Sequence, residues 1–462
     1  MNKVLMLAYY FPPLGMGGTQ RPAKFARYLP ESGWQPVVLS VKPIAYWAED
    51  PSLLDELAGV EIVRTGSFDP QRLLRVVRGE PRRPEGGEAE AAGNGRAPAG
   101  AGGKVVAWIN RRLLPWFLLP DSKILWSWHA RRAAAALLRS GTFSAIWSTS
   151  PPHSTHLIAR RLARRYRLPW IADFRDAWAE SVVVHQPTAW HRRRQEALLR
   201  RVAGAADLLI GVTPGIVTEL EAAGGAGKTR LMTNGFDAAD FSVATPAPAA
   251  ATPAGPTATP LPASPAGTQA PAAAAAAPRF TLCHCGSISR FSDPAPLLAA
   301  LRPQDAGCLR LHFVGYDAGG SLTRQVRASG LESLITCSGY RPHHEAIAAM
   351  TAADALVLIA CDEPGARFIP GKSFEYLASR KPILLISNVT ETLRLLAVQP
   401  GVVACAPDQP QAIRAALERL QQDPELARAA AMRDLRPFDR RQQAALLAGM
   451  LQQLSEKPLP RR

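Results

Sequence analysis

The sequence predicts an α/β fold with two domains, each built on a parallel sheet that helices cover on both faces. The chain has 462 residues, in which apolar runs of strand length alternate with segments whose apolar residues recur every three or four positions. This alternation occurs twice, before and after a stretch rich in alanine and proline. Strand–helix alternation of this length is typical of parallel sheets, so we expect two Rossmann-like domains that face each other across a cleft.

Six apolar runs of four to six residues predict strands in the first half of the chain: Val4–Tyr9, Pro36–Val41, Val60–Arg64, Ser144–Ser148, Trp170–Asp173 and Leu208–Val212. Helical patterns lie between them. The segment Arg21–Leu29, for example, places Pro22, Phe25, Ala26 and Leu29 on one face. We expect residues 1–238 to form the first domain.

Six further runs predict strands in the second half: Phe280–Cys285, Leu309–Val314, Leu334–Cys337, Ala355–Ile359, Ile383–Ile386 and Val402–Cys405. We expect residues 280–435 to form the second domain. Two segments lack the large apolar side chains that folding requires, namely residues 79–104 and the Ala/Pro-rich residues 242–279. The first is expected to be a low-complexity insertion, and the second a disordered linker or insertion near the domain boundary.

Composition narrows the class of protein. The formal net charge is +16, with 47% hydrophobic and 20% charged residues, which is ordinary for a globular protein. No window approaches the ~18 apolar residues of a membrane-spanning helix, and the N-terminus lacks the cleavage site of a secretory signal. The six cysteines form no CxxC pair, so buried, reduced thiols are expected rather than a metal site. These features favour a cytoplasmic protein.

Ligands of such sheets bind beyond the carboxyl ends of the strands, which directs attention to three segments of the first domain. Gly17 and Gly18 follow the first strand and precede a helix, where backbone N–H groups can contact an anion; a merely tight connection is the alternative. His153 follows the fourth strand, and is either a contact for substrate hydroxyls or a capping and packing residue. Asp173 and Asp176 follow the fifth strand beside Arg175; they are candidate catalytic carboxylates or part of a structural Arg–Asp network.

The second domain offers a candidate nucleotide site. Gly286 follows its first strand, and Arg290 lies four residues on, able to neutralise a phosphate. Later in the chain, Gly371 begins a helix that has Lys372 in its first turn and Glu375 three residues on. A lysine there is unfavourable to the helix dipole unless an anion lies in front of it. Lysine for a diphosphate and glutamate for a ribose indicate a nucleotide site, whereas an incidental Lys/Glu pair is the alternative.

In this order, the strand-end motifs resemble the GT-B glycosyltransferases of the family-4 type. The resemblance covers nearly the whole chain apart from the two low-complexity segments. It rests on the following segments: Tyr9-Tyr10-Phe11-Pro12-Pro13, the Pro36–Val41 strand after Gly33-Trp34, Asp173-Phe174-Arg175-Asp176-Ala177-Trp178, Thr233-Asn234-Gly235-Phe236-Asp237, Phe313-Val314-Gly315 and Pro370-Gly371-Lys372-Ser373-Phe374-Glu375-Tyr376-Leu377-Ala378.

The resemblance implies a GT-B fold and transfer of a sugar from a nucleotide-diphosphate sugar, usually with retention of configuration. It implies that the donor lies on the second domain and that the acceptor, a glycan or a lipid-linked molecule, docks on the first. It also implies that residues 436–456 form a C-terminal helix that crosses back to the first domain. An apolar stripe suits that role: Leu446, Leu447, Met450, Leu451 and Leu454.

The sequence departs from the family pattern at two places. The family often carries two glutamates eight residues apart; Glu375 matches the second, but position 367 is Arg367. Ser287 occupies the position of a donor-phosphate arginine, which leaves Arg290 and Lys372 as the candidates to stabilise the departing diphosphate. No DxD sequence occurs, so no metal and no other cofactor is expected. A non-catalytic nucleotide-sugar-binding protein and a GT-B-type nucleotide-sugar epimerase stay open as alternatives.

The excess of positive charge suggests contact with an anionic membrane surface. Arginines cluster in two helices, and a segment from Trp108 to Trp128 mixes aromatic residues with arginine. A solvated basic surface over core aromatics is the alternative. Nucleic acid is not an expected partner, because no nucleic-acid-binding motif is visible. We expect a peripheral enzyme on the inner face of the cell membrane that acts in bacterial surface-polysaccharide biosynthesis.

Overall fold

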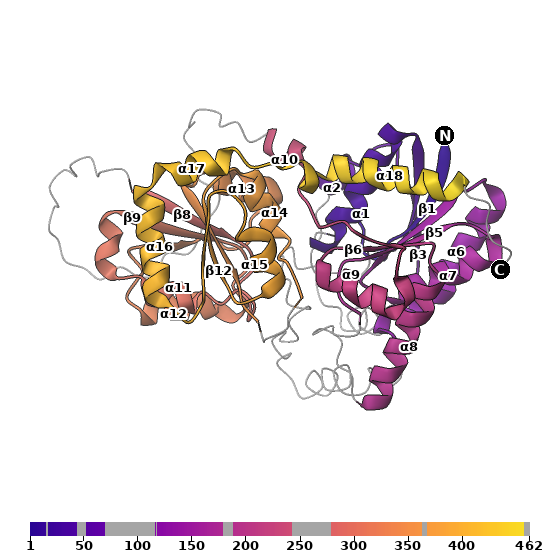
Figure 1. Ribbon diagram of the computed structural model, residues 1–462, viewed down its shortest axis with the longest axis horizontal. Coiled ribbons are helices and arrows are strands. Elements are labelled where there is room, and N and C mark those ends of the chain that lie inside the picture. Colours follow the sequence, from indigo (N-terminus) through magenta and orange to yellow (C-terminus); the bar gives the residue numbers. More distant parts are fainter. Residues whose placement is uncertain are drawn as a thin grey trace, which may run out of the picture.

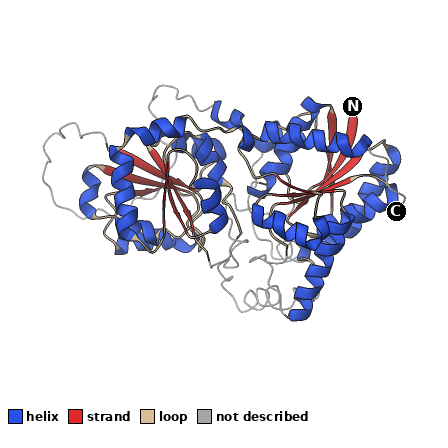
Figure 2. Cartoon of the chain, in the orientation of Figure 1, coloured by secondary structure: helices blue, strands red, loops and turns tan. Residues whose placement is uncertain are grey.

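The computed structural model describes residues 1–14, 17–43, 52–69, 116, 118–178, 188–242, 279–362 and 367–456. Two parallel sheets lie side by side along the longest axis of the molecule, each with helices on both faces (Figures 1 and 2). The predicted α/β fold with two Rossmann-like sheets is therefore confirmed. Residues 79–104 and 243–278 lie outside the described residues.

The first sheet has seven strands in the order β3-β2-β1-β4-β5-β6-β7. Their bounds are β1 (Asn2–Leu7), β2 (Trp34–Val41), β3 (Glu61–Thr65), β4 (Ala145–Ser150), β5 (Trp170–Phe174), β6 (Leu208–Gly211) and β7 (Thr229–Leu231). Six of these match the predicted strands, whereas β7 was not predicted. It has only three residues, and its middle and last residues, Arg230 and Leu231, are exposed, so it carries no buried apolar run.

Helices cover both faces of this sheet: α1 (Gly17–Tyr28), α6 (Ser127–Ser140), α7 (Ser154–Tyr166), α8 (Ala189–Ala205) and α9 (Pro214–Leu220), with the short helices η2 (Ser122–Trp126) and α2 (Ser52–Asp55). Helix α1 begins four residues before the predicted start at Arg21, because the glycines that precede it also adopt helical geometry. The side chain of Thr213 caps α9 by accepting a hydrogen bond from the N–H of Ile216 at 3.2 Å.

The second sheet has six strands, which match the six predicted ones, and their order is β10-β9-β8-β11-β12-β13. Their bounds are β8 (Phe280–Cys285), β9 (Leu309–Val314), β10 (Ile335–Cys337), β11 (Ala355–Ala360), β12 (Ile383–Ser387) and β13 (Val402–Cys405). The covering helices are α11 (Ala295–Ala300), α12 (Ser321–Ala328), α13 (His343–Ala352), α14 (Lys372–Ala378), α15 (Thr390–Leu396), α16 (Pro410–Gln422) and α17 (Pro424–Ala431).

The last helix, α18 (Arg440–Glu456), lies on the first sheet's side of the molecule, alongside α1 (Figure 1). Ala444, Leu447 and Leu451 are buried in a core that they share with Phe25 of α1, whereas Leu446 of the predicted stripe is exposed. Where the chain crosses back, the N–H of Phe236 donates to the carbonyl of Phe438 at 2.9 Å. The exact domain boundaries stay predictions.

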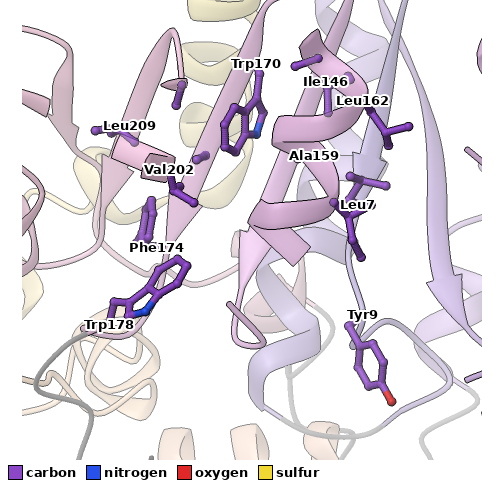
Figure 3. Close-up of a cluster of buried hydrophobic side chains, with 14 of the residues drawn as sticks. Leu7, Tyr9, Ile146, Ala159, Leu162, Trp170, Phe174, Trp178, Val202 and Leu209 are labelled. Carbon is purple, nitrogen blue, oxygen red and sulfur yellow. The ribbon is translucent and has the colours of Figure 1, made fainter. Parts of the chain in front are cut away.

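Each sheet buries one core on each face. In the first domain, Trp170, Phe174 and Trp178 lie on one side of the sheet with residues of α7 and α8 (Figure 3). Among the described residues, no helix combines the length and apolar character needed to cross a bilayer.

The cysteines are free, but the prediction that they are buried is only partly right. Cys283 and Cys285 are buried on one face of β8, with their Sγ atoms 3.5 Å apart. Cys308 and Cys337 are exposed. Cys308 precedes a strand, and Cys337 ends the edge strand β10, which has a neighbouring strand, β9, on one side only.

Candidate functional site

The carboxyl ends of the two sheets face each other, because residues that follow them come into contact. Gly215 in the first turn of α9 follows β6, Glu391 in the first turn of α15 follows β12, and Arg367 follows β11. A Cβ atom added at Gly215 would lie 2.6 Å from Oε1 of Glu391 and 2.9 Å from Cδ of Arg367. Residues at these strand ends therefore approach one another from both domains.

Asp173, at the end of β5, is the centre of a buried polar network in the first domain. Its carboxylate accepts hydrogen bonds from Nε and Nη2 of Arg21 at 2.8–3.2 Å and from the hydroxyl of Thr149 at 2.8 Å. Asp173 is completely buried, and Arg21 is nearly so. Because both carboxylate oxygens already have partners, the geometry fits a residue that positions other groups.

Arg21 links that network to the segment that leads toward the second domain. Its Nη1 donates to the carbonyl of Thr233 at 2.7 Å, and its Nη2 donates to the carbonyl of Met232 at 3.2 Å. Arg21 was not among the predicted site residues. Its partner Asp173 lies 152 positions away in the sequence, so no local pattern reveals the pair.

Arg175 holds the glycine turn after β1 in place. Its guanidinium donates to the carbonyls of Ser150, Pro151 and Gly18. A Cβ atom at Gly18 would lie 3.0 Å from Nη1 of Arg175, so Gly18 allows this close approach. Burial lowers the pKa of Arg175, and Asp176 opposes that shift. Arg175 thus brings Gly18 close to the segment that follows β5. Gly17, directly before Gly18 in the sequence, is the first residue of α1.

His153 is buried at the start of α7, where its ring stacks on Trp178 with a centroid distance of 4.5 Å and an interplanar angle of 18°. Burial lowers the pKa of His153 to about 3, and a hydrogen bond to the backbone of Ala177 opposes this shift. Its Nδ1 has no hydrogen-bond partner among the described residues. At neutral pH the ring is therefore neutral and can offer a hydrogen bond, but it is poorly suited to act as a general acid.

Asp176 differs from Asp173, because its side chain reaches solvent. The surrounding protein nevertheless desolvates the carboxyl group and raises its pKa, while Arg175 opposes the shift. A solvent-accessible carboxylate at this strand end is free to contact a substrate hydroxyl. Of the three predicted catalytic residues, Asp176 is therefore the one whose geometry best suits direct contact.

In the second domain, two glycine turns touch at the ends of β8 and β9. The N–H of Gly286 donates to the carbonyl of Val314 at 2.9 Å, and a Cβ atom at Gly315 would lie only 2.0 Å from the carbonyl oxygen of Gly286. Gly315 thus keeps the Gly286 turn close to β9. Arg290 follows this turn with an exposed side chain, and its guanidinium stacks 4.4 Å from the ring of Phe291.

Lys372 and Glu375 lie in the first turn of α14, after Gly371. Nζ of Lys372 donates to Oε2 of Glu375 at 2.8 Å, and both side chains are partly buried. The predicted lysine and glutamate are therefore adjacent. The contact also fits an incidental pair, so their binding roles stay a prediction.

Arg440, the first residue of α18, is a buried cation close to the predicted ribose-binding glutamate, and sequence reasoning missed it. Burial lowers the pKa of Arg440 to about 10; the nearby Arg21 adds to this shift and Glu375 opposes it. Its Nη1 has no hydrogen-bond partner among the described residues. In the sequence, nothing distinguishes Arg440 from the neighbouring Arg441, so the burial of Arg440 could not be predicted.

Within the ranges that the structure describes, no group of three or more His, Cys, Asp or Glu side chains is placed to hold a metal ion.

The geometry defines a two-domain protein of the GT-B class, in which two Rossmann-like domains present their strand ends to each other. Comparisons with known proteins place the first domain in a family. Residues 16–235 match the family model for the glycosyl transferase 4-like domain. No curated relative matches the chain. The first domain matches the glycosyl transferase 4-like domain family, and the fold of the chain as a whole is of the GT-B type.

Solved structures share the fold over nearly the whole chain. The Anabaena protein HepE in complex with UDP and glucose is 15% identical, with a TM-score of 0.60 over 98% of this chain and 100% of its own. Sucrose-phosphate synthase from Thermosynechococcus elongatus is 16% identical, with a TM-score of 0.60 over 98% of both chains. The lipopolysaccharide outer core galactosyltransferase WaaB is 11% identical, with a TM-score of 0.55 over 98% of this chain and 100% of its own.

Proposed function

We propose that the protein transfers a sugar from a nucleotide-diphosphate sugar to a hydroxyl group of a glycan or lipid-linked acceptor, with retention of configuration. The observation that carries the proposal is the Lys372–Glu375 pair at the start of α14, on a sheet whose strand ends face those of the other domain. Lysine supplies positive charge for the diphosphate, and glutamate accepts hydrogen bonds from the ribose diol. A uridine nucleotide is the first donor to test, because HepE has a similar fold and was solved with UDP.

Departure of the nucleotide leaves negative charge on the diphosphate, which the site must stabilise. Lys372 and the exposed Arg290 are the proposed cations. The buried Arg440, whose Nη1 has no partner among the residues that the structure describes, adds a third donor near Glu375. The backbone amides at Gly17, Gly18 and Gly371 are proposed to line the diphosphate from both domains, with the Gly286 turn beside them. Because the sequence has no DxD motif, these groups are proposed to act without a metal.

The acceptor is proposed to lie on the first domain, over the strand ends of β4 and β5. Asp176 would orient the acceptor hydroxyl, since its carboxylate reaches solvent. The neutral His153 would offer a hydrogen bond to a sugar hydroxyl. Asp173 would act through Arg21, by fixing the backbone at Met232 and Thr233. The acceptor would attack from the face that the nucleotide leaves, and approach of the two domains would exclude water.

The first domain presents features that suit a membrane-bound acceptor. Trp116, Trp128 and Trp190 are exposed, whereas Trp126 of the same segment is completely buried. Exposed tryptophan beside arginine suits the interface of an anionic bilayer. We propose that the protein works in the cytoplasm at the inner face of the cell membrane, in surface-polysaccharide biosynthesis.

The test replaces Lys372 and Glu375 separately by alanine and measures UDP binding and then turnover with the identified donor. The control is E425A/R428A, which removes an exposed Glu/Arg pair with the same i,i+3 spacing on α17. Each site variant should bind UDP about 10- to 100-fold more weakly, as expected for the loss of a charge-assisted contact, while the control binds normally. Near-native turnover in both site variants would reject this site. Donor binding without transfer or hydrolysis would favour a non-catalytic binding protein, and conversion of the donor without acceptor an epimerase.

A further inference from the structure

A small pocket in the first domain lies outside the proposed donor site. It opens between η2, α6 and α7 and has a volume of about 40 Å³. Its lining residues are Ile124, Ser127, Arg131, Leu157, Ile158 and Arg161. The volume exceeds what a single buried water needs. Aliphatic side chains therefore share the pocket with two guanidinium groups and one hydroxyl.

The two arginines give the pocket an unbalanced positive charge. Arg131 on α6 and Arg161 on α7 have exposed side chains, and neither is hydrogen-bonded or ion-paired within the part of the chain that the structure describes. No Asp or Glu occurs from residue 122 to residue 172. That stretch carries nine basic residues: Lys123, Arg131, Arg132, Arg139, Arg160, Arg161, Arg164, Arg165 and Arg167. A surface with this field is complementary to an anion.

The hydroxyl of Ser127 supplies a second, independent sign of a ligand. Its Oγ is buried and has no hydrogen-bond partner among the described residues. Buried hydroxyl groups normally have a partner, and a hydroxyl can donate to an anionic oxygen. An oxygen of a phosphate group in the pocket would satisfy Ser127 and both guanidinium groups together.

An exposed aromatic residue next to Ser127 in the sequence indicates where such a phosphate comes from. Trp128 follows Ser127 directly and is 58% exposed. Its ring lies 6.4 Å from the exposed ring of Phe68, and the guanidinium of Arg132 lies 5.8 Å from its centroid. Tryptophan beside arginine is typical of groups that insert at the headgroup level of a bilayer. The surroundings therefore favour a lipid headgroup over a free phosphate.

We propose that the pocket between α6 and α7 binds the phosphate group of an anionic lipid and thereby docks the first domain on the membrane. The inference rests on the proposed function, because an enzyme that uses a lipid-linked acceptor must reach that acceptor at the membrane. Lipid binding is measured without any sugar transfer, however. A failure of the lipid-binding proposal is therefore distinguishable from a failure of the proposed glycosyltransferase function.

The test compares the full chain with the pocket variant R131Q/R161Q and the control R139Q/R165Q. The control removes the same charge from exposed positions of the same two helices. Each protein is co-sedimented with vesicles of phosphatidylcholine alone or mixed with phosphatidylglycerol, and thermal unfolding confirms folding. The wild type should bind only the mixed vesicles. The pocket variant should lose at least about tenfold more affinity than the control.

Equal losses in the two double variants would show that net charge alone matters, and would overturn the proposal. So would wild-type binding that is equal for both vesicle types or absent from both. The variant S127A changes no charge and should weaken binding to the mixed vesicles about fivefold; unchanged affinity would place the headgroup elsewhere. Stabilisation by inorganic phosphate without vesicle binding, or tighter binding to a duplex oligonucleotide than to the mixed vesicles, would also contradict it.

Discussion

The buried pair of Arg21 and Asp173 lets a structural role be separated from a catalytic one. The substitution Asp173→Asn keeps the shape of the side chain but removes its charge. Arg21, only 1% exposed, would keep the amide oxygen and the backbone carbonyls of Met232 and Thr233 as acceptors, but it would lose its counter-charge. Breaking a buried ion pair in this way costs about 3–5 kcal/mol. At ~2–4 °C per kcal/mol, the unfolding temperature of the first domain should fall by about 6–20 °C.

This loss of stability is measured by thermal unfolding that circular dichroism monitors. Two further variants show whether it comes from the buried charge. The control D434N breaks an exposed pair with Arg436 and should leave the unfolding temperature unchanged. The double variant R21M/D173L removes both charges and should recover much of the stability. UDP binding should survive in D173N at temperatures where the protein is folded. A D173N variant that unfolds at the wild-type temperature yet has no turnover would refute the structural role and assign the carboxylate to the chemistry.

Two further predictions concern single residues. Because the pKa of His153 is about 3 in the fold, whereas that of a free histidine side chain is 6.5, the unfolded chain takes up the proton first. The stability that the neutral ring confers is complete above pH 6.5 and is lost as the pH falls toward 3, by about 2 kcal/mol at pH 5. His153→Phe keeps the stack on Trp178 but cannot take up a proton. The free energy of unfolding should therefore depend less on pH in this variant than in the wild type between pH 6.5 and 3, and equal pH dependence in the two proteins would contradict the burial argument. Gly315→Ala should destabilise the second domain by about 1–3 kcal/mol and weaken UDP binding, because its Cβ would meet the Gly286 carbonyl at 2.0 Å. Gly307→Ala, with no atom within 4 Å of the added Cβ, is the control, and equal effects in both variants would contradict the role of the close approach.

The sequence is sufficient to predict most strands, because a buried parallel strand is a continuous apolar run such as Ile383–Ile386. It does not predict β7, since Arg230 lies in the middle of a three-residue strand that is held by backbone pairing to β6. The extent of α1 was also missed, because Gly17 and Gly18 favour no helix by themselves.

Within the candidate site, sequence motifs locate residues that share a strand end or a helix turn, such as Lys372 and Glu375. They do not reveal pairs formed by tertiary packing. The sequence suggested a network of Asp173 with the neighbouring Arg175, but the partner of Asp173 is Arg21. Arg175 instead donates hydrogen bonds to backbone carbonyls. Arg440 approaches Glu375 only because α18 crosses back to the first domain. Such contacts depend on the path of the whole chain.

Calorimetric titration of UDP into the wild-type protein and the E375A variant tests the central claim most directly. If Glu375 and its neighbours hold the nucleotide of the donor, the wild type binds one equivalent of UDP saturably and E375A binds it far more weakly. Equal affinities in the two proteins would contradict the site. A wild-type protein that binds neither UDP nor any other nucleoside diphosphate would contradict the proposed function itself.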